Sequence, residues 1–94
     1  MSKELSPDLR EQYRLSVLGY LARVAGRALT ESVLAQFLRS EWGNSVDRDT
    51  VTQLVAYLSG KGFVEEAPKH ISPEVRAWRI TATGSDEHAR LTGE

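Results

Sequence analysis

Apolar residues recur every three or four positions in three stretches of the chain, the spacing that places them on one face of an α-helix. In the first stretch, residues 6–25, they are Leu9, Tyr13, Val17, Tyr20, Leu21 and Val24. In the second, residues 30–42, they are Val33, Leu34, Phe37, Leu38 and Trp42. In the third, residues 47–60, they are Val51, Leu54, Val55 and Leu58. The pattern predicts three amphipathic helices with these residues facing inward.

Helix-start and helix-stop residues bound the three stretches. A short polar side chain that can accept a backbone N–H bond stands at each start: Ser6, Thr30 and Asp47. Residues that favour a helix end follow each stretch: Gly26, Gly43 with Asn44, and Gly60 with Gly62. We therefore expect the helices to begin at the capping residues and to end near these glycines.

The pattern changes to alternation after residue 62. "FVEE" predicts one strand, and "RAWRITA" predicts a second, with Trp78 and Ile80 on one face and Arg79 on the other. Together they form a hairpin over residues 63–81, and "RAL" at residues 27–29 suits a further short strand. Thr81 can cap a last helix over residues 82–91, which Gly84 would weaken. The fold class is α+β, as a single domain over residues 1–94.

The first helix has a second apolar side, made by Leu15, Leu18 and Ala22. Two alternatives explain it. The helix is central and covered on both sides by its own chain, or the second side packs against another copy in a dimer.

Length, charge and cysteine content limit the function. A chain of 94 residues is about one small domain with a thin core. The absence of cysteine excludes disulfides, thiolate metal sites and thiol catalysis, and fits a cytoplasmic protein. No apolar run approaches the roughly 20 residues that span a membrane. The net charge of −1 means that DNA binding would depend on local clusters of cations or on two copies acting together.

The order of elements and one long motif carry a family resemblance. The stretch "VDRDTVTQLVAYLSGKGFVEE…WRITATG" resembles the pattern shared by ArsR-, MarR- and PadR-type regulators. The matching positions are Leu58, Gly62, Phe63, Val64, Ile80, Thr81 and Gly84. The resemblance implies a winged helix-turn-helix, with residues 47–60 as the recognition helix and residues 63–81 as the wing.

The chain is also similar to small winged-helix proteins of Mu-like transposable phages and prophages. The similarity rests on "RLSVL" (14–18) and "VDRDTV" (46–51). It implies a phage origin and the cytoplasm of a bacterial host. The sequence departs from the pattern in its longer wing tip, "PKHISPEV", and in Asp47, where a neutral serine cap is common.

The exposed face of the third helix is the first candidate DNA-binding site. It carries Arg48, Asp49, Thr52 and Gln53. In the major groove an arginine pairs with guanine, a glutamine with adenine and an aspartate with cytosine, while a threonine meets the thymine methyl group. The alternative is the ordinary polar face of a surface helix.

The wing is the second candidate site, because it holds the densest cations of the chain. These are Lys69, His70, Arg76 and Arg79. Wing cations commonly contact phosphate or enter the minor groove. The alternative is an edge strand that its charges protect from pairing with other chains.

Catalysis, a metal and a cofactor are not expected. Asp86, Glu87 and His88 are consecutive, and consecutive helical residues point in different directions, so they form no chelating face.

Taken with the resemblance, the two candidate sites predict a transcriptional regulator that binds double-stranded DNA sequence-specifically as a homodimer. The alternative is a protein–protein interaction module that binds a host or phage protein instead of DNA.

Overall fold

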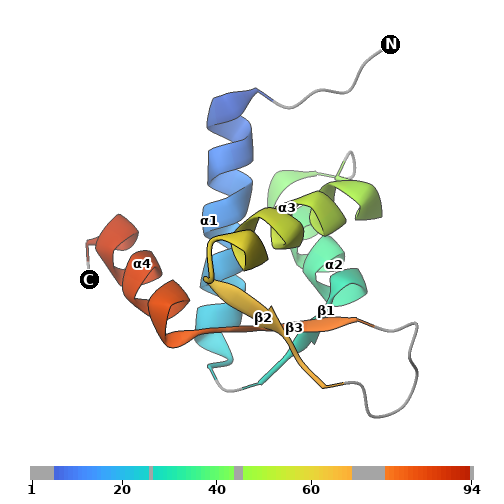
Figure 1. The fold of residues 1–94 in the computed structure, drawn as a ribbon. Coiled ribbons are helices and arrows are strands. Elements are labelled where there is room, and N and C mark those ends of the chain that lie inside the picture. The colour runs from blue at the N-terminus through green and yellow to red at the C-terminus, as the bar shows by residue number, and fades with distance from the viewer. Residues whose placement is uncertain (1–5, 26, 44–45, 69–75, 94) are drawn as a thin grey trace.

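The chain forms four helices and three short strands in the predicted order, within the residues that the computed structural model describes, 6–25, 27–43, 46–68 and 76–93. The helices are α1 (Pro7–Arg23), α2 (Glu31–Trp42), α3 (Arg48–Gly60) and α4 (Ala82–Thr92). The strands are β1 (Leu29–Thr30), β2 (Val64–Glu66) and β3 (Ala77–Ile80). In Figure 1, α1 is the central column, with α4 on its left and α3 and α2 on its right. This arrangement confirms the α+β class.

Each described helix begins at the residue that the sequence indicates. Ser6, Thr30, Asp47 and Thr81 each accept a bond from the backbone N–H three residues further on. The donor–acceptor distances are 3.1, 3.2, 2.8 and 3.0 Å in that order. All four predicted caps are therefore confirmed.

The helix ends agree less closely with the sequence predictions. Helix α1 ends at Arg23 rather than at residue 25, and α4 continues to Thr92 rather than stopping at residue 91. Gly43 ends α2 with a φ of 110°, a backbone conformation that residues with a Cβ rarely adopt. The predicted stops at Gly26 and Asn44 lie outside the described residues.

One hydrophobic core joins the helices to the sheet. Its buried side chains are Tyr13, Val17, Leu18, Leu21, Leu34, Ala35, Leu38, Val46, Val51, Leu54, Val55, Leu58, Val64 and Trp78. The stripe predicted for the third helix is wholly buried. Because α4 packs against α1 and Leu18 is 1% exposed, the chain itself covers part of the second apolar side, while Leu15 and Ala22 are half-buried. The second apolar side therefore does not need another copy to bury Leu18.

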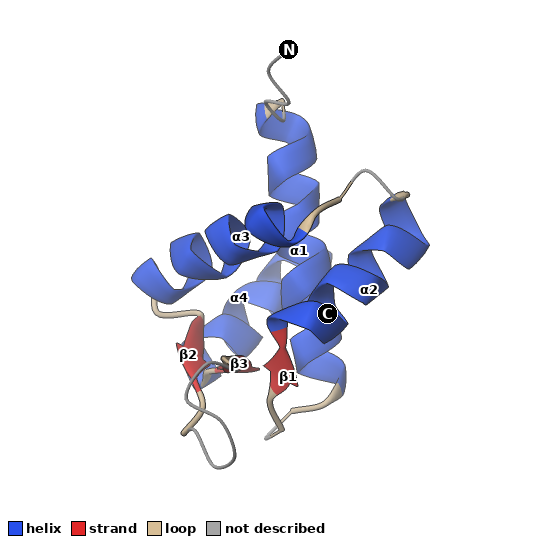
Figure 2. Cartoon of the chain, turned by 90° about the vertical axis from the view of Figure 1, so that its right-hand side faces the viewer, coloured by secondary structure: helices blue, strands red, loops and turns tan. Residues whose placement is uncertain are grey.

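The three strands form one small antiparallel sheet in the order β1–β3–β2. Strand β3 is central, and its Trp78 stands opposite Leu29 on one side and Glu66 on the other. Figure 2 shows the strands at one end of the molecule, below α3. The predicted hairpin is present as β2 and β3, so the wing extends from the C-terminal end of α3.

Phe37 corrects the prediction for the second helix. We expected it to face inward, but its side chain is 42% exposed. The buried stripe of α2 runs through Leu34, Ala35 and Leu38, and Phe37 lies to one side of it. There it packs edge-to-face on Tyr20, with ring centroids 5.3 Å apart.

Burial of the Tyr20 side chain raises the pKa of its hydroxyl above the ordinary value, and a hydrogen bond with Glu41 raises this pKa further.

Gly84 has a packing role that the sequence did not indicate. A Cβ at this position would lie 1.9 Å from the carbonyl oxygen of Phe63. The first turn of α4 therefore lies directly against the chain that leads from α3 into the wing. Gly84, which we expected only to weaken the helix, permits this close approach.

Among the described residues, no helix has the length and apolar character to cross a membrane.

Candidate nucleic-acid interface

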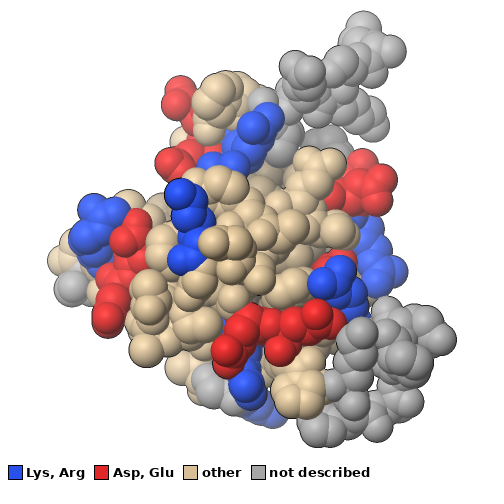
Figure 3. Space-filling model, in the orientation of Figure 1, with Lys and Arg blue, Asp and Glu red and all other residues tan. Residues whose placement is uncertain are grey.

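The face of α3 opposite its buried stripe is open to solvent. Arg48, Asp49, Gln53 and Tyr57 are all exposed on it. Figure 3 shows this side of the molecule in the orientation of Figure 1: its centre is largely uncharged, and acidic groups form a band below it. Of the four predicted base-contacting residues, Arg48, Asp49 and Gln53 are thus accessible to a ligand that approaches α3.

Thr52, the fourth predicted residue, is half-buried and faces α2. Its hydroxyl oxygen lies 2.8 Å from Oε1 of Glu31 and 3.1 Å from the carbonyl oxygen of Arg48. The hydroxyl hydrogen is therefore used within the protein. This hydroxyl is therefore not available to donate a bond to a base.

Glu31 joins the three elements around the candidate interface. It is 5% exposed, at the first position of α2. Its carboxylate accepts one bond from the hydroxyl of Thr52 on α3 and another, 3.0 Å long, from the indole Nε1 of Trp78 on β3. One buried side chain therefore ties α2 to both α3 and β3.

The two acids at the start of α3 have different environments. Oδ1 of Asp47 accepts bonds from both the backbone nitrogen and the hydroxyl of Thr50, each 2.8 Å long. The carboxylate of Asp47 is thus used at the helix N-terminus. Asp49, two residues further, is exposed on the face that carries Arg48 and Gln53.

The wing arginines lie opposite acids on the neighbouring strand. Nε and Nη2 of Arg76 are each 3.3 Å from an oxygen of Glu66, and Nε of Arg79 is 2.7 Å from Glu65. The hydrogen bond with Glu66 raises the pKa of Arg76. Among the described wing residues these charges balance. Lys69 and His70, the other predicted wing residues, lie outside the described residues.

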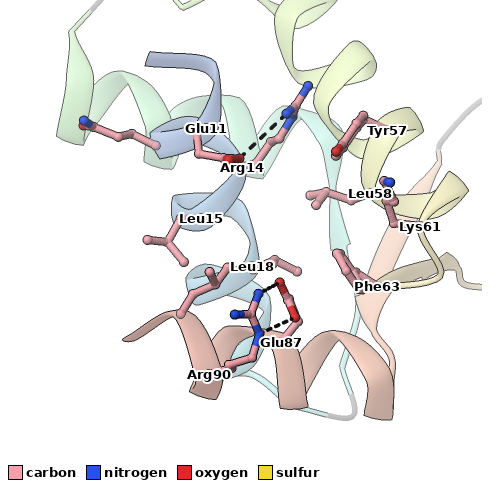
Figure 4. Close-up of a pocket in the computed structure, with 12 residues that line it drawn as sticks. Glu11, Arg14, Leu15, Leu18, Tyr57, Leu58, Lys61, Phe63, Glu87 and Arg90 are labelled. Carbon is pink, nitrogen blue, oxygen red and sulfur yellow. Dashed lines mark hydrogen bonds and ion pairs between the residues drawn. The ribbon is translucent and has the colours of Figure 1, made fainter. Parts of the chain in front are cut away.

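Two arginines of α1, which the sequence patterns did not single out, lie beside α3. A groove of about 300 Å³ is lined by Arg10, Arg14, Thr50, Gln53, Leu54 and Tyr57. The guanidinium carbon of Arg14 lies 3.5 Å from the centre of the Tyr57 ring, and Figure 4 shows the two side chains meeting between α1 and α3. The spacing of Arg10 and Arg14 places them on one helix face, which was the available signal.

A second groove lies between α1, α3 and α4. It has a volume of about 390 Å³, and its apolar walls include Leu15, Leu18, Leu58, Phe63 and Leu91. Figure 4 shows Glu87 and Arg90 of α4 beside it, where Nε of Arg90 lies 3.0 Å from Oε1 of Glu87. The hydrogen bond from Arg90 lowers the pKa of Glu87. Leu91 is 49% exposed at the edge of this groove.

Metal-binding chemistry has no visible basis in the described part of the chain. No group of three or more His, Cys, Asp or Glu side chains is gathered there in a way that could hold a metal ion. In the segment with Asp86 and His88, Glu87 instead pairs with Arg90.

Comparison with known proteins supports the fold rather than a close family assignment. No protein-family model matches the sequence, and a search of curated proteins gives no significant match. Among solved structures, the chain is similar to a mutant of MepR from a multidrug-resistant S. aureus clinical isolate. The identity is 19% and the TM-score 0.73, over 88% of this chain and 56% of that one.

Two further structures give the same result. One is ZitR of Lactococcus lactis, a zinc-responsive MarR family member, with 14% identity and a TM-score of 0.68 over 99% of this chain and 55% of that one. The other is the PcaV transcriptional regulator of Streptomyces coelicolor, with 22% identity and a TM-score of 0.70 over 98% of this chain and 56% of that one. The chain thus spans a little over half the length of these three proteins.

These likenesses establish the class of fold. The chain is a winged helix of the kind found in MarR-family structures, with four helices and a small three-stranded antiparallel sheet. The fold predicted from the sequence is confirmed.

Proposed function

We propose that this protein binds double-stranded DNA through α3 and regulates transcription. The observation that carries the proposal is the exposed polar face of α3 on a winged-helix scaffold, where Arg48, Asp49 and Gln53 project from the side opposite the buried stripe. In helix-turn-helix proteins this face enters the major groove. We infer that the protein acts in the cytoplasm, and the phage origin stays a prediction from the two short motifs.

The chemistry of α3 supports sequence-specific contacts. Gln53 can bond to adenine and Arg48 to guanine, each through two atoms of the base edge. Asp49 can accept a bond from cytosine. Thr52 contributes its methyl group, because Glu31 engages its hydroxyl. The prediction that the wing contacts the DNA backbone remains for Lys69, His70, Arg76 and Arg79.

A homodimer is the proposed functional form. The half-exposed Leu91 stands at the apolar groove that Leu15 and Phe63 also line. A second copy that covers this groove would remove the apolar surface from water. It would also present two recognition helices to successive major grooves.

A salt-titrated binding assay tests the proposal. Fluorescence anisotropy with a labelled random-sequence duplex should show binding that weakens as salt rises. Basic side chains that bind phosphate release counterions from the DNA, and added salt opposes this release. Selection from a random duplex pool should then enrich one motif, and Gln53→Ala should relax the preference at one position of that motif. Absence of duplex binding even at low salt contradicts the proposal.

The neutral wing favours a second candidate function, a protein-interaction module. Arg76 and Arg79 are paired with Glu66 and Glu65, and the net charge of the whole chain is −1. A surface with balanced charges suits a protein partner from the host or the phage at least as well as a polyanion. If the wild-type protein fails to bind duplex at low salt, this candidate replaces DNA binding.

A further inference from the structure

Two of the cations beside α3 belong to α1. Arg10 and Arg14 line the same groove as Gln53, which is the central exposed polar residue of α3. Lys61, at the C-terminal end of α3, lies on the Tyr57 ring with its Nζ 5.7 Å from the centroid. Basic groups of two helices therefore converge around Tyr57, next to the face of α3 that is proposed to enter the DNA major groove.

Arg14 is held in place, but its charge is only partly compensated. Its side chain is 20% exposed and stacks on Tyr57. It pairs with Glu11 at 3.9 Å, and the side chain of Glu11 is 75% exposed. Nε of Arg14 is buried without a hydrogen-bond partner among the described residues. A stacked guanidinium loses little further freedom when it binds an anion, because its position is already fixed.

This environment differs from that of the wing arginines. Arg79 has a carboxylate oxygen at 2.7 Å, and Arg76 has two at 3.3 Å. A DNA phosphate would have to displace those carboxylates or share the arginines with them. At Arg14 the corresponding competitor within the described chain is an exposed glutamate at 3.9 Å, which solvent screens.

We propose that Arg14 and Arg10 form a phosphate-binding site on α1, which holds the DNA backbone at the edge of the major groove that α3 enters. This inference rests on the proposed function. The planar guanidinium presents paired N–H donors that match two oxygens of one phosphate. The Tyr57 ring holds Arg14 against α3, and a phosphate bound there would fix the depth at which Gln53 meets the bases.

The alternative role for Arg14 is purely structural, as the side chain that joins α1 to α3 through Tyr57. The salt dependence of DNA binding separates the two roles. A phosphate contact adds about 0.9 to the magnitude of the slope of log K against log salt, whereas a structural contact adds nothing. The slope is therefore the decisive quantity.

The experiment compares Arg10→Gln and Arg14→Gln with wild type on a random-sequence duplex of about 30 base pairs, long enough for two half-sites. Arg23→Gln is the matched control, since Arg23 is an exposed arginine in the last turn of the same helix. We expect each test variant to reduce the slope magnitude by about 0.9 for each phosphate contact that it loses, and to weaken binding most at low salt. The control should keep the wild-type slope.

The outcomes are distinguishable. If Arg14→Gln melts at a much lower temperature than wild type, the exposed Arg10→Gln decides. A wild-type slope in Arg10→Gln and in a folded Arg14→Gln overturns the phosphate site while DNA binding stands. If the wild-type protein does not bind the duplex at low salt, the proposed function fails, and this site fails with it.

Discussion

Asp47 is the N-cap of α3 and Asp49 lies in its first turn, yet only Asp47 has a structural task. The Asp47 carboxylate accepts the backbone N–H of Thr50 at 2.8 Å. Asp47→Ala should therefore lower the free energy of unfolding by about 0.5–2 kcal/mol, the usual effect of losing such a cap. Asp49→Asn is the control and should leave it nearly unchanged. Thermal melting of both variants checks this, and equal destabilisation would contradict the distinction.

Asp49 should instead affect binding. Its exposed carboxylate lies on the face proposed to approach phosphates, where it repels them. Asp49→Asn should tighten non-specific duplex binding, most clearly at low salt, where charges are least screened. Titration of a random duplex at two salt concentrations measures the change. If affinity at low salt is unchanged, α3 does not approach DNA as proposed.

Glu31 gives a different test, of the link between helix and wing. Glu31→Ala leaves the buried indole N–H of Trp78 without its acceptor, and should lower the free energy of unfolding by about 1–3 kcal/mol. Trp78→Phe should then lower the free energy of unfolding less in the Glu31→Ala variant than in wild type, because the bond between the two side chains is already absent. Denaturant unfolding of the two single variants and the double variant measures this coupling. Additive losses would show that the bond contributes nothing.

Residue roles could be predicted from the sequence where the partner is close in the chain. The cap of Asp47 involves an N–H three residues away, so the local pattern was sufficient. Glu31 bonds to Thr52, which is 21 positions away, and to Trp78, which is 47 positions away. Its burial depends on tertiary packing. These two contacts could therefore not be predicted from the sequence.

The close contact between α4 and the wing depends on a missing side chain. Gly84→Ala would place a methyl group 1.9 Å from the Phe63 carbonyl oxygen, so the helix or the strand must shift. We expect a loss of about 1–3 kcal/mol in the free energy of unfolding. Gly60→Ala is the matched control, since its Cβ would meet no atom of the described residues within 4 Å. The control should be neutral or stabilise by up to about 1 kcal/mol. A neutral Gly84→Ala in denaturant unfolding would show that α4 is not held against the wing in this way.

The order and approximate bounds of the elements could be predicted because hydrophobic period and turn residues are local signals. What could not be predicted was how the elements face one another. The pairing of Arg79 with Glu65 follows from the register of β2 and β3, and the position of Arg14 beside Tyr57 follows from the packing of α1 on α3. Arg76 and Arg79 are paired with acids more closely than Arg14 is, so cation density alone could not locate the α1 groove.

At the scale of the whole molecule, 12 Lys and Arg stand against 13 Asp and Glu, so the long-range field gives little attraction to DNA. Affinity must then come from a few contacts near α3, or from two copies that bind together. Two linked sites on one duplex strengthen binding without any new contact within either copy. The charge balance therefore makes the oligomeric state more important for this chain than it would be for a strongly basic one.

The exposed edge of the groove between α1, α3 and α4 supplies the test of assembly. Leu91 is 49% exposed there, and a dimer that uses this groove would bury it. Leu91→Asp should then shift the mass measured by light scattering at tens of micromolar from dimer toward monomer, because a charge would have to be buried at the interface. Phe37→Asp is the matched control, since Phe37 is 42% exposed on α2 and does not line that groove. The same Leu91→Asp variant should bind a two-site duplex more weakly, with little change on a duplex too short for two copies. A wild-type protein that is strictly monomeric in this range, or a dimer that Leu91→Asp leaves intact, would exclude this interface.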